Sequence, residues 1–187
     1  FDFRVGIAQN SYMSRRDGFT MIELLIVIAL IMILSAIGLG SFTISTTRSY
    51  DSQRKSDINQ ISKALESFNN DVNRYPLSDA QGNILCYQKD GSVITNPSCS
   101  GSKLTIRIDG IVTSYILMPS DPDGSNKYIY ESDGSTFALY TYIQNPKDKD
   151  LILDEAGNAL TDTFKKTCGT DKCNYKITEA GLAKTNE

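Results

Sequence analysis

The sequence predicts an α+β fold in which a long N-terminal α-helix packs by its second half on a small antiparallel β-sheet. Three observations support this prediction: an apolar run at residues 19–42, a helical apolar stripe that continues to residue 72, and short β-rich runs after residue 76. The chain has 187 residues, enough for one modest domain and an appendage but not for a second sizeable core.

The apolar run at residues 19–42 contains a single ionisable side chain, that of Glu23. As a helix this run would be about 35 Å long, which is enough to cross a hydrocarbon core of about 30 Å. Arg15 and Arg16 precede it directly, so the positive-inside rule places the N-terminus in the cytoplasm and the rest of the chain outside. We therefore expect a single-pass protein with an extracytoplasmic domain.

Glu23 needs a partner, because a carboxylate inside a membrane span costs about 2.5–3.5 kcal/mol. Residues 19–42 contain no basic side chain that could serve. Cleavage between Gly18 and Phe19 would create a cationic α-amino group one helical turn from Glu23, and a neighbouring copy could offer the same group. The alternatives are an ordinary signal peptide cut after Gly38 and a simple uncleaved anchor, and both leave Glu23 unexplained.

The same segment reads GFTMIELLIVI at residues 18–28, which strongly resembles the N-terminal signal of type IV pilins and type II secretion pseudopilins. In that family a prepilin peptidase cuts after the glycine and methylates the new N-terminal phenylalanine, and the glutamate aids recruitment into a filament. The resemblance implies that Gly18 ends the leader, that Phe19 is the methylated N-terminus and that Glu23 is the recruitment acid. Residues 1–18 are then the leader, of which we expect residues 1–12 to come from an upstream start or a fragment boundary.

The helical pattern continues beyond the apolar run as a stripe of apolar residues spaced by three and four. Tyr75-Pro76 closes this pattern, because the residue before proline disfavours the helical region. Residues 43–75 are therefore expected to be the extramembrane half of the long helix. The stripe consists of Ile58, Ile61, Leu65, Phe68 and Val72.

Residues 76–187 are expected to form a small β-rich head. Strands are predicted at residues 103–108, 127–131, 137–143 and, more weakly, 174–178, with a tight turn at 132–135. This architecture is also the pilin fold that the resemblance implies. Residues 74–76 (RYP) and 118–130 (MPSDPDGSNKYIY) resemble the major pseudopilin of type II secretion more loosely, and Asp123 departs from that pattern by standing in place of an aromatic residue.

Four cysteines, all outside the membrane in this topology, indicate two disulfides in an oxidising compartment. Three pairings exist, and short loops favour Cys86–Cys99 and Cys168–Cys173. A zinc site at Cys168 and Cys173 is the weaker interpretation, because no second spaced pair accompanies it.

Two clusters of acidic residues raise the question of a metal, but neither has the glycine offset of a calcium loop. Some pseudopilins that this chain resembles hold calcium in a late loop. We expect ordinary solvated turns and no cofactor, with calcium as the alternative. The first cluster contains Asp121, Asp123 and Asn126, and the second contains Asp148, Asp150, Asp154 and Glu155.

An enzymatic role is not predicted. The chain contains no His, the usual general base, and Ser52-x-x-Lys55 lacks the partner motifs of the hydrolases that use such a pair. The net charge of −3 gives no indication of a nucleic-acid partner.

The sequence instead predicts a structural subunit of a pilus-like filament, for type II secretion or a type IV pilus. It would start as a single-pass protein of the bacterial cytoplasmic membrane and end in a filament in the periplasm or on the cell surface. Expected partners are copies of itself, other pilins or pseudopilins, the prepilin peptidase, an inner-membrane assembly platform and the lipid bilayer. The alternative is a secreted or membrane-tethered extracytoplasmic binding module that uses residues 19–42 as an ordinary signal or anchor.

Overall fold

The structure is a computed structural model that describes residues 18–99, 103–160 and 162–183, without the side chains of residues 37–41. The predicted leader up to residue 17, with Arg15 and Arg16, lies outside these ranges. The chain divides into two compact units, residues 1–43 and residues 44–187. Each unit is described by itself.

One helix, α1 (Met21–Val72, 52 residues), contributes to both units. In the first unit its large apolar side chains up to Leu34 are exposed. Among the described residues, no helix is both long and apolar enough to qualify as a membrane span.

The helix ends at Val72, three residues before the predicted boundary at residue 75. Asn73 has a left-handed φ of 55°, and its amide donates to the carbonyl of Asn69 at 2.7 Å. A residue in this conformation is a common helix terminator, and asparagine tolerates it better than most side chains do. Tyr75-Pro76 follows two residues later.

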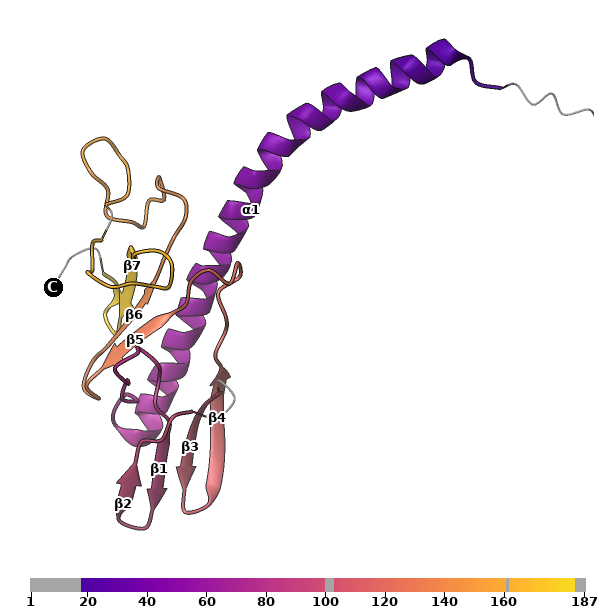
Figure 1. The fold of residues 1–187 in the computed structure, drawn as a ribbon. Coiled ribbons are helices and arrows are strands. Elements are labelled where there is room, and N and C mark those ends of the chain that lie inside the picture. The colour runs from indigo at the N-terminus through magenta and orange to yellow at the C-terminus, as the bar shows by residue number, and fades with distance from the viewer. Residues whose placement is uncertain (1–17, 100–102, 161, 184–187) are drawn as a thin grey trace, which may run out of the picture. The chain divides into compact units, whose positions relative to one another are not determined.

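The second unit contains two four-stranded sheets (Figure 1). The first has the strand order β2-β1-β3-β4, and the second has the order β5-β6-β7-β8. The first sheet is built from β1 (Tyr87–Asp90), β2 (Val93–Thr95), β3 (Lys103–Ile108) and β4 (Ile111–Leu117). The second is built from β5 (Ile129–Ser132), β6 (Phe137–Thr141), β7 (Tyr175–Thr178) and β8 (Gly181–Leu182).

The α+β class is thus confirmed, whereas the prediction of one small antiparallel sheet is wrong. The second sheet is antiparallel throughout, but β1 and β3 pair in parallel within the first. The reason is that the β1–β2 hairpin returns the chain to the end at which β1 begins, so β3 starts there and runs beside β1 in the same direction. Strands β1, β2, β4 and β8 were not predicted. Strands β1, β2 and β8 are only two to four residues long, and β1 is mostly polar, whereas the seven-residue strand β4 was overlooked.

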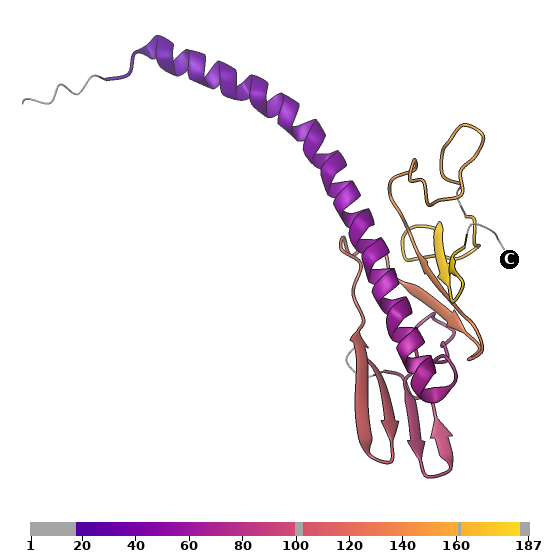
Figure 2. The same cartoon turned by 180° about the vertical axis from the view of Figure 1, so that it is seen from behind.

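The apolar stripe of α1 lies in the core of the second unit. Ile58, Ile61, Leu65 and Phe68 have no exposed surface, and they share one cluster with buried side chains of both sheets. Figures 1 and 2 show the C-terminal part of α1 alongside the two sheets. Burial of each such side chain stabilises the fold by about 1.5–3 kcal/mol. The sheet residues of this cluster include Tyr87, Leu104, Ile106, Tyr130, Phe137, Leu139, Tyr175 and Ile177.

Two disulfides close short loops around these sheets. Cys86 bonds to Cys99 across 13 residues, and Cys168 bonds to Cys173 across five. This is the sequence-local pairing of the three that four cysteines allow. Because both cysteines of the second pair are completely buried, that disulfide belongs to the core of the head.

Candidate functional site

The first candidate site is the N-terminus of α1, where Thr20 and Glu23 form a reciprocal cap. The amide and the hydroxyl of Thr20 donate to Glu23 Oε2 at 2.8 and 2.7 Å. In return, the amide of Glu23 donates to the Thr20 hydroxyl at 3.3 Å. This is the capping box, in which a threonine before the helix and a glutamate three residues later satisfy each other's backbone donors.

The cap gives Glu23 a partner within its own chain, which the sequence reasoning had not identified. The signal was local, because T-x-x-E ahead of an apolar run is the usual pattern of a helix start. It was missed because the search was for a positive charge. Thr20 donates hydrogen bonds but carries no charge, so a cation at this carboxylate would still be an additional partner.

Gly18 and Phe19 lie immediately before the helix, in chain without regular secondary structure. The Phe19 side chain is 89% exposed, and a Cβ added to Gly18 would meet no atom within 4 Å. Within the part of the chain that the structure describes, both residues of this bond are therefore exposed.

The second candidate site lies in the second unit and is called here the polar turn, residues 51–57 of α1. Its centre is Arg54, whose side chain is completely buried. Its guanidinium donates to Asp121 through Nε at 2.7 Å and Nη2 at 3.0 Å, to Asp123 at 2.7 Å, and to Asp51 at 3.1 Å. Such charge-assisted, bidentate pairs are the strong class of hydrogen bond, and they fix geometry as well as energy.

The pKa values of the polar turn follow from these contacts. Burial alone would lower the pKa of Arg54, but its bonds to Asp121 and Asp123 outweigh burial and raise that pKa above its ordinary value. Burial would raise the pKa of Asp123. Hydrogen bonds with Asp121 and Ser125 of its own loop, together with the charge of Arg54, instead lower this pKa to about 2. Both groups are therefore charged at neutral pH.

Two further acids of the polar turn hold the head's loops through neutral donors. The Asp51 carboxylate accepts the backbone amides of Gln144 and Asn145, each at 2.8 Å. The Asp57 carboxylate accepts the hydroxyl of Tyr128 at 2.7 Å. Burial, followed by the bond to Asp57, raises the pKa of Tyr128 above its ordinary value. The polar turn is thus the place where side chains of α1 attach to three separate segments of the head.

Lys55 completes the polar turn on the side of the late loop. Its ammonium donates to Asp148 Oδ1 at 2.5 Å and to Asp150 Oδ2 at 2.7 Å. Burial would lower the pKa of Lys55, but these two carboxylates more than compensate and raise it. Consecutive helix residues thus hold two different acidic loops, Arg54 the earlier one and Lys55 the later one.

The expectation that both acidic clusters are solvated turns is therefore wrong at Asp121, which is buried against Arg54. Asn126, from the same cluster, donates to Asp171 at 3.1 Å. In the later cluster, Asp154 accepts the amide of Asn158 within its own loop. Across residues 18–99, 103–160 and 162–183, no three His, Cys, Asp or Glu side chains are grouped as metal ligands.

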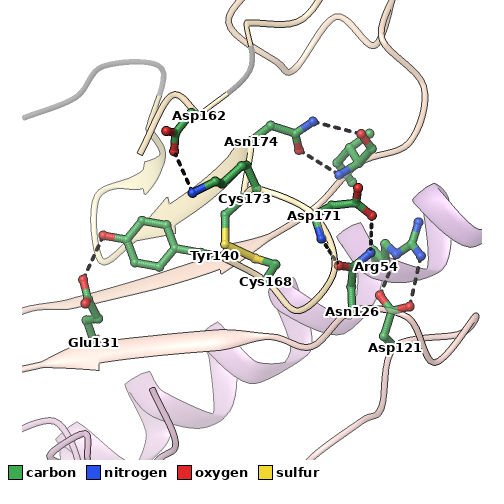
Figure 3. Close-up of a disulfide and its surroundings, with 12 residues drawn as sticks. Arg54, Asp121, Asn126, Glu131, Tyr140, Asp162, Cys168, Asp171, Cys173 and Asn174 are labelled. Carbon is green, nitrogen blue, oxygen red and sulfur yellow. Dashed lines mark hydrogen bonds and ion pairs between the residues drawn. A yellow bond between two sulfur atoms is a disulfide. The ribbon is translucent and has the colours of Figure 1, made fainter. Parts of the chain in front are cut away.

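The loop closed by Cys168 and Cys173 supports the segment that carries Asp121 (Figure 3). Asp171 and Asn126 exchange two hydrogen bonds, each at 3.1 Å, and the Lys127 amide donates to the carbonyl of Cys168 at 2.6 Å. Asn174, which follows the disulfide, bonds both the amide and the carbonyl of Ile143. The disulfide loop therefore braces both segments that contact the polar turn through Arg54 and Asp51.

Comparison with known proteins finds a known motif around the N-terminal site. Residues 13–39 match the family model described as the prokaryotic N-terminal methylation motif. The Type II secretion system core protein G of Pectobacterium carotovorum subsp. carotovorum is 25% identical over 156 residues, which are 82% of this chain and 92% of that protein. The Type IV major pilin protein PilA of Myxococcus xanthus (strain DK1622) is 41% identical over 61 residues, which are 33% of this chain and 28% of that protein.

No solved structure matches the chain closely enough to support a comparison. The two relatives differ in what they share with it, since one aligns along most of the chain and the other over a third. The resemblance predicted from residues 18–28 is confirmed: the chain carries the N-terminal methylation motif and is similar to a type II secretion core protein G and to a type IV major pilin.

Proposed function

We propose that this chain is a structural subunit of a pilus-like filament, made as a precursor that is cut after Gly18 and methylated at Phe19. The single observation that carries this proposal is the methylation motif at residues 13–39. The exposed, non-helical chain at Gly18 and Phe19 supports it, because a peptidase needs an extended and accessible bond. A prepilin peptidase would perform both reactions, and the chain itself would carry out no catalysis.

Before assembly, the subunit would lie in the cytoplasmic membrane with its N-terminus in the cytoplasm and its head outside. The apolar residues 19–42 would form the span, and the exposed large apolar side chains from Phe19 to Leu34 would later pack against the same segment of other subunits. An inner-membrane assembly platform and further pilins or pseudopilins would be the remaining partners. We assign no cofactor to this function.

Glu23 would act in assembly through its charge. After cleavage, the amine of Phe19 is a cation at neutral pH, and the Glu23 carboxylate of a neighbouring subunit can neutralise it. The hydrogen bonds from Thr20 hold this carboxylate at the start of the helix but do not neutralise its negative charge. Glu23 would thus combine a local role as a cap with an intermolecular role as a counter-ion.

Two substitutions separate these roles. Glu23→Gln retains a side chain that can complete the capping box but removes the charge, whereas Glu23→Val removes both. The proposal predicts that both variants enter the membrane normally and that both fail to assemble into filaments, as measured by shearing and sedimentation from cells. Assembly of the Gln variant at the wild-type level would show that Glu23 serves only as a cap.

Such a filament belongs either to a type II secretion system or to a type IV pilus. Core protein G, the relative that aligns along most of the chain, favours type II secretion. Electron microscopy of cells that overproduce the protein, compared with cells that lack the gene, distinguishes a long surface fibre from a short periplasmic one. The competing function is a secreted or tethered binding module, for which Glu23→Val would have no effect.

A further inference from the structure

The first sheet ends in two hairpin turns that are joined to each other. Residues 91–92 connect β1 to β2, and residues 109–110 connect β3 to β4, at the lower end of the sheet in Figure 1. The Gly91 amide donates to Asp109 Oδ1 at 2.8 Å, and the Asp109 amide donates to the carbonyl of Lys89 at 2.9 Å. We call this end of the sheet the apolar tip, after its exposed side chains Val93, Ile94, Ile111 and Val112.

The apolar tip exposes more aliphatic surface than the fold requires. Ile111 is 73% exposed, more than any other large apolar side chain described in the second unit, and its neighbour Val112 is 61% exposed. The strand register also places Ile94 and Ile111 in one row across the sheet, through Lys89 and Ile108. Exposed apolar side chains gathered in one place are typical of a contact with another molecule.

A cavity of about 490 Å³ lies at the opposite end of the same sheet. Its lining includes Leu85, which precedes β1, Cys99, which precedes β3, and Met118, which directly follows β4. The seven residues of β4 separate this end from the apolar tip by about 20 Å. The buried side chains of the lining include Ile84, Tyr130 and Leu139.

The phenolic and acidic groups that line this cavity are already hydrogen-bonded within the chain. Both tyrosine hydroxyls of the lining, those of Tyr128 and Tyr130, donate to acceptors of the chain at 2.7 Å. Of the two carboxylates of the lining, that of Asp79 accepts amides of its own loop and that of Asp121 accepts the guanidinium of Arg54. These groups need no polar ligand, and the buried lining offers aromatic rings and aliphatic chains. The cavity therefore suits an aliphatic side chain.

We propose that the apolar tip of one subunit inserts Ile111 and Val112 into this cavity of a second copy of the chain. Because tip and cavity lie at opposite ends of one sheet, the contact is heterologous, and its repetition gives an open row of heads and not a closed dimer. Charge favours the same pairing, since Asp90 and Asp109 flank the turns of the tip and the exposed Lys127 lines the cavity. The inference deepens the proposed filament function and rests on it.

Cysteine cross-linking of filaments sheared from cells gives the first test. Ile111→Cys/Ser120→Cys places one thiol on the apolar tip and one at the cavity, while the four native cysteines are held in disulfides. A short bis-maleimide is expected to produce a ladder of dimers, trimers and longer chains, because each head carries both sides of the contact. Ile111→Cys/Ser135→Cys is the matched control, since Ser135 is an exposed serine between β5 and β6. A ladder no stronger than the control's, or dimers alone, would overturn the proposal.

The yield of sheared filaments from Ile111→Asp gives a second test. Burial of an isoleucine strengthens a contact by about tenfold or more, so the yield should fall to about a tenth of the wild-type yield or less. Cleavage after Gly18 and the unfolding midpoint should not change, because Ile111 is exposed in the single chain. Leu182→Asp is the matched control, since Leu182 is an exposed aliphatic residue of β8, and it should assemble normally.

The outcomes separate this contact from the filament function. Filaments of Ile111→Asp at the wild-type yield would overturn the contact and leave the proposed function intact. If the wild-type protein itself yields no sheared filaments, the proposed function fails. Cross-linking of the purified full-length Ile111→Cys/Ser120→Cys protein in detergent at high concentration then decides the contact alone, and a yield no higher than that of Ile111→Cys/Ser135→Cys would overturn it.

Discussion

Replacement of Arg54 is expected to be the most damaging single change to a charged residue of the second unit. Arg54→Met keeps an apolar stem of similar length but leaves the carboxylates of Asp51, Asp121 and Asp123 without their common cation. Breaking a buried ion pair by removing one partner costs about 3–5 kcal/mol. For a unit of this size, 1 kcal/mol shifts the unfolding midpoint by roughly 2–4 °C, so the expected loss is roughly 6–20 °C.

The assay is thermal unfolding of the full-length protein in detergent, followed by circular dichroism. Arg48→Met is the matched control, because Arg48 is an exposed arginine of the same helix within the head unit. It is expected to change stability by no more than about 0.5 kcal/mol. The addition of Asp121→Asn to Arg54→Met should recover part of the loss, because it removes one uncompensated charge. If Arg54→Met shifts the midpoint no further than Arg48→Met does, the polar turn is not an energetic centre of the head.

Three further predictions concern the same unit. Phe68→Ala should destabilise the second unit by about 3–5 kcal/mol in urea unfolding, because Phe68 is completely buried and its ring packs against Tyr87 and Tyr115 of the first sheet. A loss below about 1 kcal/mol would contradict that packing. Replacement of both Cys168 and Cys173 by serine should lower the free energy of unfolding by about 2–5 kcal/mol. It should also loosen the loops that the disulfide supports, so that hydrogen exchange at the Gln144 amide becomes faster. Unchanged exchange at this amide would show that the disulfide does not support these loops. The pKa of Asp123 falls from 3.8 to about 2 on folding, so its contribution to stability is present above pH 4 and should disappear as the pH falls towards 2. In Asp123→Asn, this part of the decrease in the free energy of unfolding with falling pH should be absent. The same decrease in the variant as in the wild type would show that Asp123 does not contribute.

The features that the sequence predicted are those that local pattern determines. The spacing of Ile58, Ile61 and Leu65 predicted the buried face of α1, and Tyr75-Pro76 predicted the end of the helix to within three residues. Both depend on residues that are at most one or two helical turns apart. The N-terminal motif at residues 18–28 is equally local, and its identification was confirmed by the family comparison.

Apart from the seven-residue strand β4, which was overlooked, the features that escaped prediction depend on distant residues or on very short strands. Arg54 meets Asp121 across 67 residues, and no periodicity in either segment indicates that the two side chains meet. The parallel pairing of β1 with β3 depends on the path of the intervening chain and not on the strands themselves. The capping box between Thr20 and Glu23 differs, because it was readable from the sequence and was overlooked when only charged partners were considered.

The central claim concerns the bond between Gly18 and Phe19, and the N-terminus of the mature protein tests it most directly. The protein would be purified from membranes of the native host, and its N-terminal residue and intact mass would be determined by mass spectrometry. The account predicts a chain that starts at Phe19 and carries one additional methyl group on its amine. A chain that starts near Leu39, or one that still contains Met13, would contradict it and would leave Glu23 with the Thr20 cap as its partner in the described chain.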